Sequence, residues 1–140
     1  MAGATRAIEI DAPIEKCFEV ITKYEDYPKF LSDMKAVTVT ARNNGNVEAS
    51  FTLKVVMEVQ YKLRLTEKAP NEVSWVLAEG KMFKQNDGGW KLEALGPNKT
   101  RAEYRVEVDI RGFVPKSVAT GLVETTLPKT LQAFKERCEE

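Results

Sequence analysis

Residues 47–65 read VEASFTLKVVMEVQYKLRL, with a hydrophobic residue at every odd-numbered position. A period of two places these side chains on one face of a β-strand. One strand of this length would span about 60 Å, whereas a compact domain of this chain's size has a radius of gyration of about 14 Å. The stretch therefore predicts a chain that folds back or bends sharply near residues 55–57.

Shorter alternating stretches flank residues 47–65, and sequences typical of tight turns separate them. Arg6–Ile10 predicts a first strand. Asparagine and glycine adopt positive φ at low cost, so Asn43–Gly45 predicts a hairpin turn. Six strands are predicted after the first: the two halves of 47–65 and four other alternating stretches. They form a largely antiparallel meander. The other turns are predicted at 69–71, 86–89 and 96–99, and the other strands at 34–41, 73–77, 90–94 and 102–110.

Two short helical segments are predicted between the first strand and the meander. Hydrophobic residues at helical spacing predict a helix that ends near Thr22, with Asp11 as its N-cap. Residues 24–31 predict a second short helix or turn. Within it, Pro28 disfavours helical angles at Tyr27, so these residues predict either a corner that ends the helix or part of a cavity gate.

One long helix closes the chain, with hydrophobic residues at helical spacing from about Pro115 to Cys138. Pro128 removes one intrahelical hydrogen bond and predicts a kink that frees the carbonyl of Glu124. A curved antiparallel sheet covered by one main helix tends to leave an apolar space, and such spaces in small domains usually hold ligands. The element order therefore predicts a single domain over residues 1–140 with an internal cavity.

The composition argues against several classes of function. Lysine plus arginine and aspartate plus glutamate number 21 each and are interleaved, so we expect no binding of nucleic acid. No hydrophobic run approaches the roughly 18 residues that cross a bilayer, and no export signal is seen, so we expect a cytoplasmic protein without stable membrane insertion, as a monomer or weak dimer. The chain has no histidine, which removes Ser/His/Asp and Cys/His catalysis. We expect no metal and no cofactor.

The two cysteines, Cys17 and Cys138, fall in different predicted helices, and no CxxC motif or Cys/His cluster is present. Free cysteine behaves as a small buried hydrophobic residue, so two buried free thiols are favoured over a disulfide or a redox pair.

Six short motifs follow one another along the chain. They are IEIDAP at 8–13, FEVI at 18–21, YEDYPKFL at 24–31, GKMFK at 80–84, GWKLE at 89–93 and PKTLQAFK at 128–135. In this order they resemble the polyketide cyclase/dehydrase branch of the START and birch-pollen-allergen (SRPBCC) superfamily, which also includes coenzyme Q-binding proteins and ribosome-association toxins. The resemblance covers the full chain and implies an α+β helix-grip fold, a curved antiparallel sheet of about seven strands around a long C-terminal helix.

Hydrophobic and aromatic residues at inward positions of such a fold are candidate ligand contacts, although each could also simply fill the core. Tyrosine and tryptophan offer apolar faces with one hydrogen-bonding tip each. No catalytic residue is assigned, because the charged residues of the strands alternate with the hydrophobic ones and so face outward. Glu124 is the nearest candidate for a general base. The candidate ligand-binding residues are Phe30, Met57, Val59, Tyr61, Trp75, Leu77, Met82, Trp90, Tyr104, Leu122 and Thr126.

Three hypotheses for function follow. The first is binding or transport of a hydrophobic small molecule, such as a lipid, a quinone or a polyketide-like aromatic, in an internal cavity. The second is a polyketide aromatase/cyclase or dehydratase, which holds a poly-β-keto chain while a few polar groups polarise its carbonyls and so requires no histidine. The third is a ribosome-association toxin-like interaction protein, which the balanced charge disfavours. Because the sequence offers no set of residues for proton transfer, we favour the first hypothesis, binding or transport.

Overall fold

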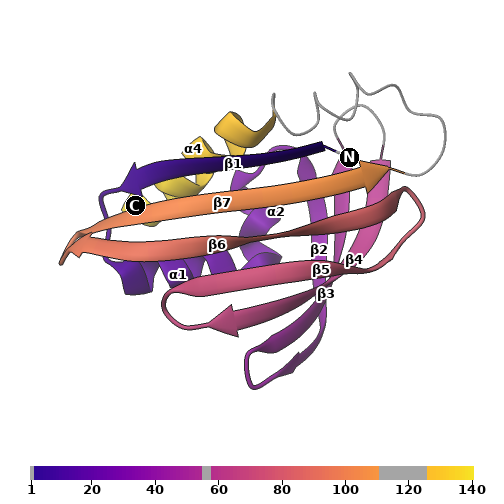
Figure 1. Ribbon diagram of the computed structural model, residues 1–140, viewed down its shortest axis with the longest axis horizontal. Coiled ribbons are helices and arrows are strands. Elements are labelled where there is room, and N and C mark those ends of the chain that lie inside the picture. The colour runs from indigo at the N-terminus through magenta and orange to yellow at the C-terminus, as the bar shows by residue number, and fades with distance from the viewer. Residues whose placement is uncertain (1, 55–57, 111–125) are drawn as a thin grey trace.

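The computed structural model describes residues 2–54, 58–110 and 126–140, which form a single antiparallel sheet with helices on one face (Figure 1). The elements are β1 (Ala2–Ile10), α1 (Ile14–Thr22), the 3₁₀ helix η1 (Tyr24–Asp26), α2 (Tyr27–Phe30), β2 (Met34–Asn43), β3 (Asn46–Lys54), β4 (Glu58–Lys68), β5 (Glu72–Gly80), β6 (Phe83–Gly96), β7 (Lys99–Ile110) and α4 (Thr126–Glu139). Among these helices, none combines the length and the hydrophobicity needed to span a membrane.

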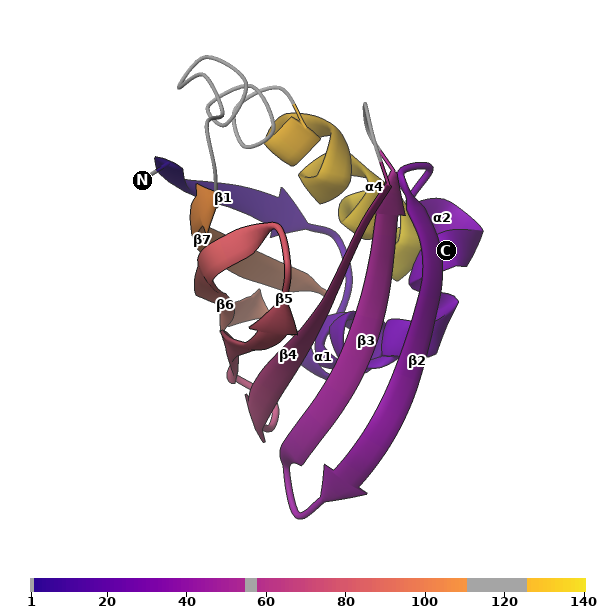
Figure 2. The same ribbon diagram turned by 90° about the vertical axis from the view of Figure 1, so that its right-hand side faces the viewer.

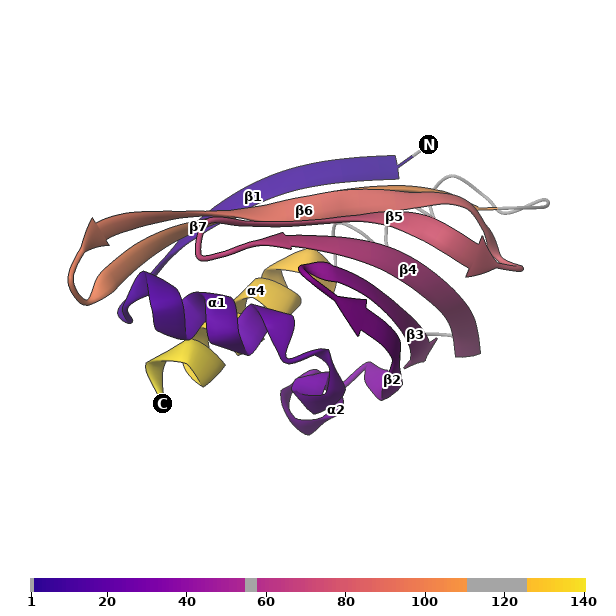
Figure 3. The same cartoon turned by 90° about the horizontal axis from the view of Figure 1, so that it is seen from below.

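The sheet has seven strands in the order β1-β7-β6-β5-β4-β3-β2, and every neighbouring pair is antiparallel. Strands β2 to β7 form a meander, and the last strand, β7, also pairs with the first, β1. Figures 2 and 3 show that the sheet curves strongly and that α1, α2 and α4 lie together on its concave face. This arrangement confirms the predicted helix-grip architecture.

The alternating stretch 47–65 is divided between two strands, as predicted. Strand β3 ends at Lys54, β4 begins at Glu58, and these two residues are paired across the ladder. Residues 55–57 lie outside the described part of the chain. The odd-numbered positions point to the concave face, since Phe51 and Leu63 are buried there.

The turn between β2 and β3 follows the sequence prediction. Asn44 and Gly45 have φ values of 48° and 84°, a left-handed conformation that asparagine and glycine adopt most easily. A Cβ on Gly45 would lie 2.8 Å from the carbonyl oxygen of Glu67. Glycine is therefore required there both by the backbone angle and by the close neighbouring strand.

The hairpin turn predicted at 86–89 was wrong, because β6 runs continuously through these residues. The turn lies instead at residues 81–82, between β5 and β6. Gly88 and Gly89 are needed for close backbone approach: a Cβ on Gly88 would lie 2.1 Å from the carbonyl oxygen of Arg105, and one on Gly89 would lie 2.6 Å from that of Val73. Glycine inside a strand marks such approaches as well as turns.

The predicted N-cap of α1 was also wrong. Pro13 occupies the N-cap position in an extended conformation and makes no side-chain cap. The backbone N–H of Asp11 instead donates a hydrogen bond to Oε2 of Glu139, at 2.8 Å. This bond ties the end of β1 to the end of α4.

Tyr27 and Pro28 do not form a corner, which was one of the two predicted alternatives. Tyr27 is helical, with φ −51° and ψ −43°, and Pro28 lies in the first turn of α2. Proline is well tolerated in a first turn, because the N–H that it lacks has no intrahelical acceptor there. The proline therefore starts this helix and does not end it.

The described part of the closing helix is α4, which buries Leu127, Leu131, Phe134 and Cys138 at helical spacing. Residues 115–125 of the predicted helix lie outside the described residues. The proposed kink at Pro128 depends on one of them, so it stays a prediction.

Both cysteines are buried and free, as predicted. Cys17 on α1 and Cys138 on α4 lie close enough that each thiol changes the pKa of the other, lowering that of Cys17 and raising that of Cys138. The two thiols therefore lie within the contact between these helices.

Candidate ligand-binding site

The concave face of the sheet and the helices beneath it share a continuous set of aromatic side chains, here called the aromatic network. Each ring contacts at least one other, and together they connect five strands with α2 and α4. The members are Tyr27, Phe30, Phe51, Tyr61, Trp75, Phe83, Trp90, Tyr104 and Phe134.

Trp90 is the centre of one half of the network. Its ring centroid lies 4.8 Å from that of Tyr104 on β7 and 5.1 Å from that of Phe134 on α4. Trp75 on β5 continues this half, 5.6 Å from Tyr104. Edge-to-face and tilted contacts at these distances are favourable for aromatic pairs, so this half links three strands to α4.

The other half is built around Tyr61 on β4. Its ring stacks on Phe51 with the centroids 5.4 Å apart, and Phe83 meets its ring edge-on at 5.3 Å. Tyr27 joins the two halves, because it contacts both Phe51 at 6.4 Å and Phe134 at 5.3 Å. The network therefore extends across the concave face from β3 to β7.

Five of the predicted ligand-binding residues belong to the network: Phe30, Tyr61, Trp75, Trp90 and Tyr104. Two more, Val59 and Leu77, pack beside Tyr61 around the buried Phe83. The side chains of Met57, Leu122 and Thr126 lie outside the described part of the chain.

Met82 is the predicted residue that the structure places elsewhere. It is half-buried in the bend between β5 and β6, and the adjacent Phe83 takes the inward position. A register shift between Phe83 and Gln85 reverses the alternation at the start of β6. Met82 was predicted to face inward because it is an even number of residues from Trp90, but the register shift interrupts this alternation.

The prediction did not select four members of the network, namely Tyr27, Phe51, Phe83 and Phe134. A signal was available for two of them, because Phe51 shares its parity with Tyr61 and Phe134 follows the helical spacing of the closing segment. Phe83 was not selected because the register shift changes which residues of β6 face inward. Tyr27 was not selected because Pro28 was interpreted as the end of a helix.

The hydroxyl groups of Tyr61 and Tyr104 are the distinctive polar groups of this face. Neither hydroxyl has a hydrogen-bond partner within the described ranges, yet both side chains keep some accessible surface. A phenol is neutral at physiological pH, and burial raises the pKa of both groups further, so they can act as hydrogen-bond donors. By contrast, the hydroxyl of Tyr27 donates to the carbonyl oxygen of Ile21.

Charged groups lie at the edges of the concave face. Glu67 accepts a hydrogen bond from the Tyr24 hydroxyl at 2.6 Å and pairs with Arg42 at 3.3 Å. Burial and then the bond to Glu67 raise the pKa of Tyr24. Over the described residues, the buried polar side chains are Asn86 and Thr100, and no group of three acidic, cysteine or histidine side chains could hold a metal.

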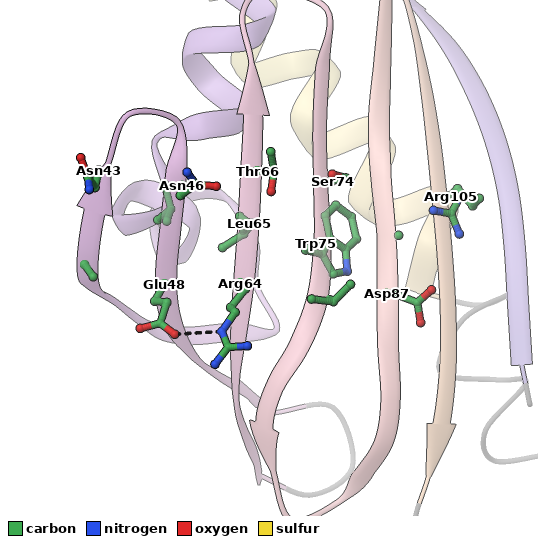
Figure 4. A pocket seen from close by; sticks show the side chains of 14 residues that line it. Asn43, Asn46, Glu48, Arg64, Leu65, Thr66, Ser74, Trp75, Asp87 and Arg105 are labelled. Atoms are coloured by element: carbon green, nitrogen blue, oxygen red, sulfur yellow. Dashed lines mark hydrogen bonds and ion pairs between the residues drawn. The ribbon is translucent and has the colours of Figure 1, made fainter.

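A groove of about 520 Å³ lies on the opposite, convex face of the sheet (Figure 4). Glu48, Arg64, Asp87 and Arg105 point into it from the side away from the helices, and Arg64 pairs with Glu48 at 3.2 Å. We call it the outer groove. Its other lining residues are Ala41, Asn43, Asn46, Val47, Leu65, Thr66, Ser74, Trp75, Val76 and Gly88.

Solved structures share this fold at low sequence identity. A START superfamily protein from Mycobacterium smegmatis is 19% identical, with a TM-score of 0.88 over 99% of this chain and 98% of its own. The Zhui aromatase/cyclase from Streptomyces sp. R1128 is 12% identical, with a TM-score of 0.82 over 97% and 90%. A STAR-related lipid transfer protein from Xanthomonas axonopodis is 14% identical, with a TM-score of 0.80 over 99% and 86%.

A family model matches nearly the whole chain. Residues 10–135 match the model described as "Polyketide cyclase / dehydrase and lipid transport". The matched range runs from the end of β1 into α4 and so contains the whole meander and the aromatic network. The chain therefore belongs to the polyketide cyclase / dehydrase and lipid transport family.

Proposed function

We propose that this chain binds a hydrophobic small molecule, such as a lipid, a quinone or a polyketide-like aromatic, between the concave face of its sheet and the closing helix. The observation that carries the proposal is the pair of hydroxyls on Tyr61 and Tyr104. Both have a raised pKa because of burial, and neither has a hydrogen-bond partner in the part of the chain that the structure describes.

Neither hydroxyl oxygen is fully enclosed, because no fully buried side-chain oxygen or nitrogen lacks a hydrogen-bond partner among the described residues. An oxygen atom of a ligand, or a water molecule, can therefore reach these hydroxyls and accept their hydrogen bonds. The partial accessibility of Tyr61 and Tyr104 supports a space beside both rings. The surrounding aromatic faces would cover the hydrophobic part of the ligand.

The same environment favours a neutral ligand over a charged one. Among the described residues, the buried polar side chains carry no charge. A carboxylate or an ammonium group brought beside Tyr61 would lose its hydration without gaining a counter-ion, which is costly. We therefore propose a ligand with carbonyl, ether or hydroxyl oxygens and without a formal charge in the buried part.

Native mass spectrometry of the freshly purified protein tests this proposal. We expect a co-purified hydrophobic molecule, or saturable binding when a neutral quinone or lipid is added, with a rise in melting temperature because the ligand binds the folded state. A matched fatty acid is the charged comparison and should bind more weakly. A protein that carries nothing and shows no thermal shift with any of these compounds would refute the proposal.

Polyketide cyclisation or dehydration is the second candidate, and the same two phenols favour it. Two neutral donors on the concave face could polarise carbonyls of a folded poly-β-keto chain. Turnover of a carrier-bound poly-β-keto thioester that is lost in both Tyr61→Phe and Tyr104→Phe would support this candidate. Tight binding of the substrate without turnover would leave binding alone as the function.

We also propose that the protein acts in the cytoplasm as a monomer or weak dimer and does not bind nucleic acid. Free Cys17 and Cys138 in contact suit a reducing compartment, and the equal numbers of acidic and basic residues offer no attraction to phosphates. Light scattering after size-exclusion chromatography and cell fractionation would test these statements; a stable higher oligomer or an exported protein would contradict them.

A further inference from the structure

The sheet is open between β5 and β6 over part of its length. These strands pair only from Glu72 with Lys91 to Trp75 with Gly88. Beyond that point β5 continues to Gly80 along β4, and β6 begins at Phe83 along β7, so each strand stays paired on its other side. The remaining lengths of β5 and β6 separate from each other (Figure 4).

The indole of Trp75 stands at this separation. On the concave side its ring lies 5.6 Å from that of Tyr104. Across the opening, its Nε1 donates a hydrogen bond to Oδ1 of Asn86 on β6, at 3.3 Å. The missing Cβ of Gly88 makes room for it, because a Cβ there would lie 2.9 Å from Cζ2 of the indole.

The outer groove lies directly over the same place. Its lining includes Trp75 and Gly88, the last pair of the β5–β6 ladder, and Val76 and Asp87, the first residues beyond it. Trp75 therefore contacts the aromatic network on one face of the sheet and the outer groove on the other. The groove volume of about 520 Å³ is within the range of roughly 300–1,000 Å³ typical of small-molecule sites.

We infer that the opening between β5 and β6 is a route into the interior, which Trp75 closes. This inference rests on the proposed function, since a route matters only if a ligand reaches the concave face. Besides its packing on Tyr104 and Gly88, one hydrogen bond of 3.3 Å holds the indole across the opening. Beyond the pair Trp75–Gly88, no ladder pairs join β5 to β6 in the described part of the chain. The molecule that passes is the same neutral hydrophobic ligand proposed above.

The route can be blocked from outside without altering the interior. Val76 lines the outer groove and is 53% exposed, so Val76→Cys can be alkylated there with N-cyclohexylmaleimide while the buried native cysteines stay unmodified. Leu95 is 44% exposed at the far end of β6 and does not line the groove. Leu95→Cys, alkylated with the same reagent, is the matched control. Intact mass would confirm one adduct on each.

The measurement is stopped-flow binding of the neutral fluorescent probe N-phenyl-1-naphthylamine to the full chain. A route affects the rates at which the probe enters and leaves but not its affinity. We therefore expect alkylated Val76→Cys to slow association and dissociation by the same several-fold factor and to leave Kd unchanged. Alkylated Leu95→Cys should exchange at the wild-type rates. Trp75→Phe, which loses the bond to Asn86, should exchange faster in both directions.

Two results would overturn the inference while the proposed function stands. One is unchanged rates in alkylated Val76→Cys although the probe still binds. The other is a weaker Kd with an unchanged association rate, which would make the groove part of a binding site and not a route. If wild-type protein binds neither this probe nor any quinone or lipid, the proposed function fails and the proposed route fails with it.

Discussion

The indole of Trp90 on β6 and the ring of Phe134 on α4 meet edge to face, with their centroids 5.1 Å apart. Both side chains are almost completely buried, and Phe134 also contacts Tyr27 and Phe30. This contact connects the closing helix to the centre of the sheet. Phe134 is therefore one of four buried side chains, with Leu127, Leu131 and Cys138, through which α4 packs over the concave face.

Phe134→Ala should therefore destabilise the fold strongly. Loss of a buried phenylalanine costs about 3–5 kcal/mol, because a cavity is left where three ring contacts are lost. Urea unfolding followed by circular dichroism would measure the change. Leu95→Ala, at an exposed position, should change stability by less than about 0.5 kcal/mol, and an equal loss in both variants would show that the ring contacts contribute nothing specific.

The hydroxyls of Tyr61 and Tyr104 should matter for the ligand and not for the fold. Tyr61→Phe and Tyr104→Phe should change the free energy of unfolding by less than about 1 kcal/mol and weaken ligand binding by about fivefold each. Tyr27→Phe is the matched control, since its hydroxyl is already bonded to Ile21. That variant should lose about 1 kcal/mol of stability and keep its affinity; the reverse pattern would contradict the assignment.

All four tyrosines of the chain have a raised pKa, with burial as the largest cause. The unfolded phenols ionise near pH 10, so the unfolded state loses protons first as the pH rises. Stability is fully present below about pH 10 and should fall above it, by up to about 1.4 kcal/mol per pH unit for each tyrosine. Absorbance at 295 nm should show no ionisation before alkaline unfolding. Reversible titration near pH 10 in folded protein would be inconsistent with buried phenols.

Gly88 should not tolerate even a methyl group. In Gly88→Ala the new Cβ would lie 2.1 Å from the carbonyl oxygen of Arg105, and a backbone atom in a ladder cannot move aside cheaply. Overpacking of this kind costs about 1–3 kcal/mol or more. Gly96→Ala meets nothing within 4 Å and serves as the control. Equal melting temperatures for the two variants would show that β6 and β7 lie further apart than described.

The fold could be predicted from the sequence because its signals are local. Alternation in 47–65, combined with the size limit of the domain, placed the break between β3 and β4. Asn43–Gly45 predicted a turn because asparagine and glycine accept positive φ, and Asn44 and Gly45 do adopt it. Both inferences require only the chain's own period and the conformational freedom of individual residues.

The site could be predicted only in part, because it depends on pairing between strands. Phe83 points inward because of a register shift against β7, which the period of β6 alone does not reveal. Gly88 and Gly89 were interpreted as a turn, although neighbouring backbones require them. The glycines and the position of Trp75 over them become visible only when three strands are side by side.

Selective ring-¹³C labelling of tyrosine tests the central claim most directly. The chain has four tyrosines, of which Tyr61 and Tyr104 would face the ligand, while Tyr24 is bonded to Glu67 at the edge of the fold. Addition of a neutral quinone or lipid should shift the ring signals of Tyr61 and Tyr104 saturably and leave that of Tyr24 in place. Unchanged signals from Tyr61 and Tyr104 at saturating ligand would contradict binding at the concave face.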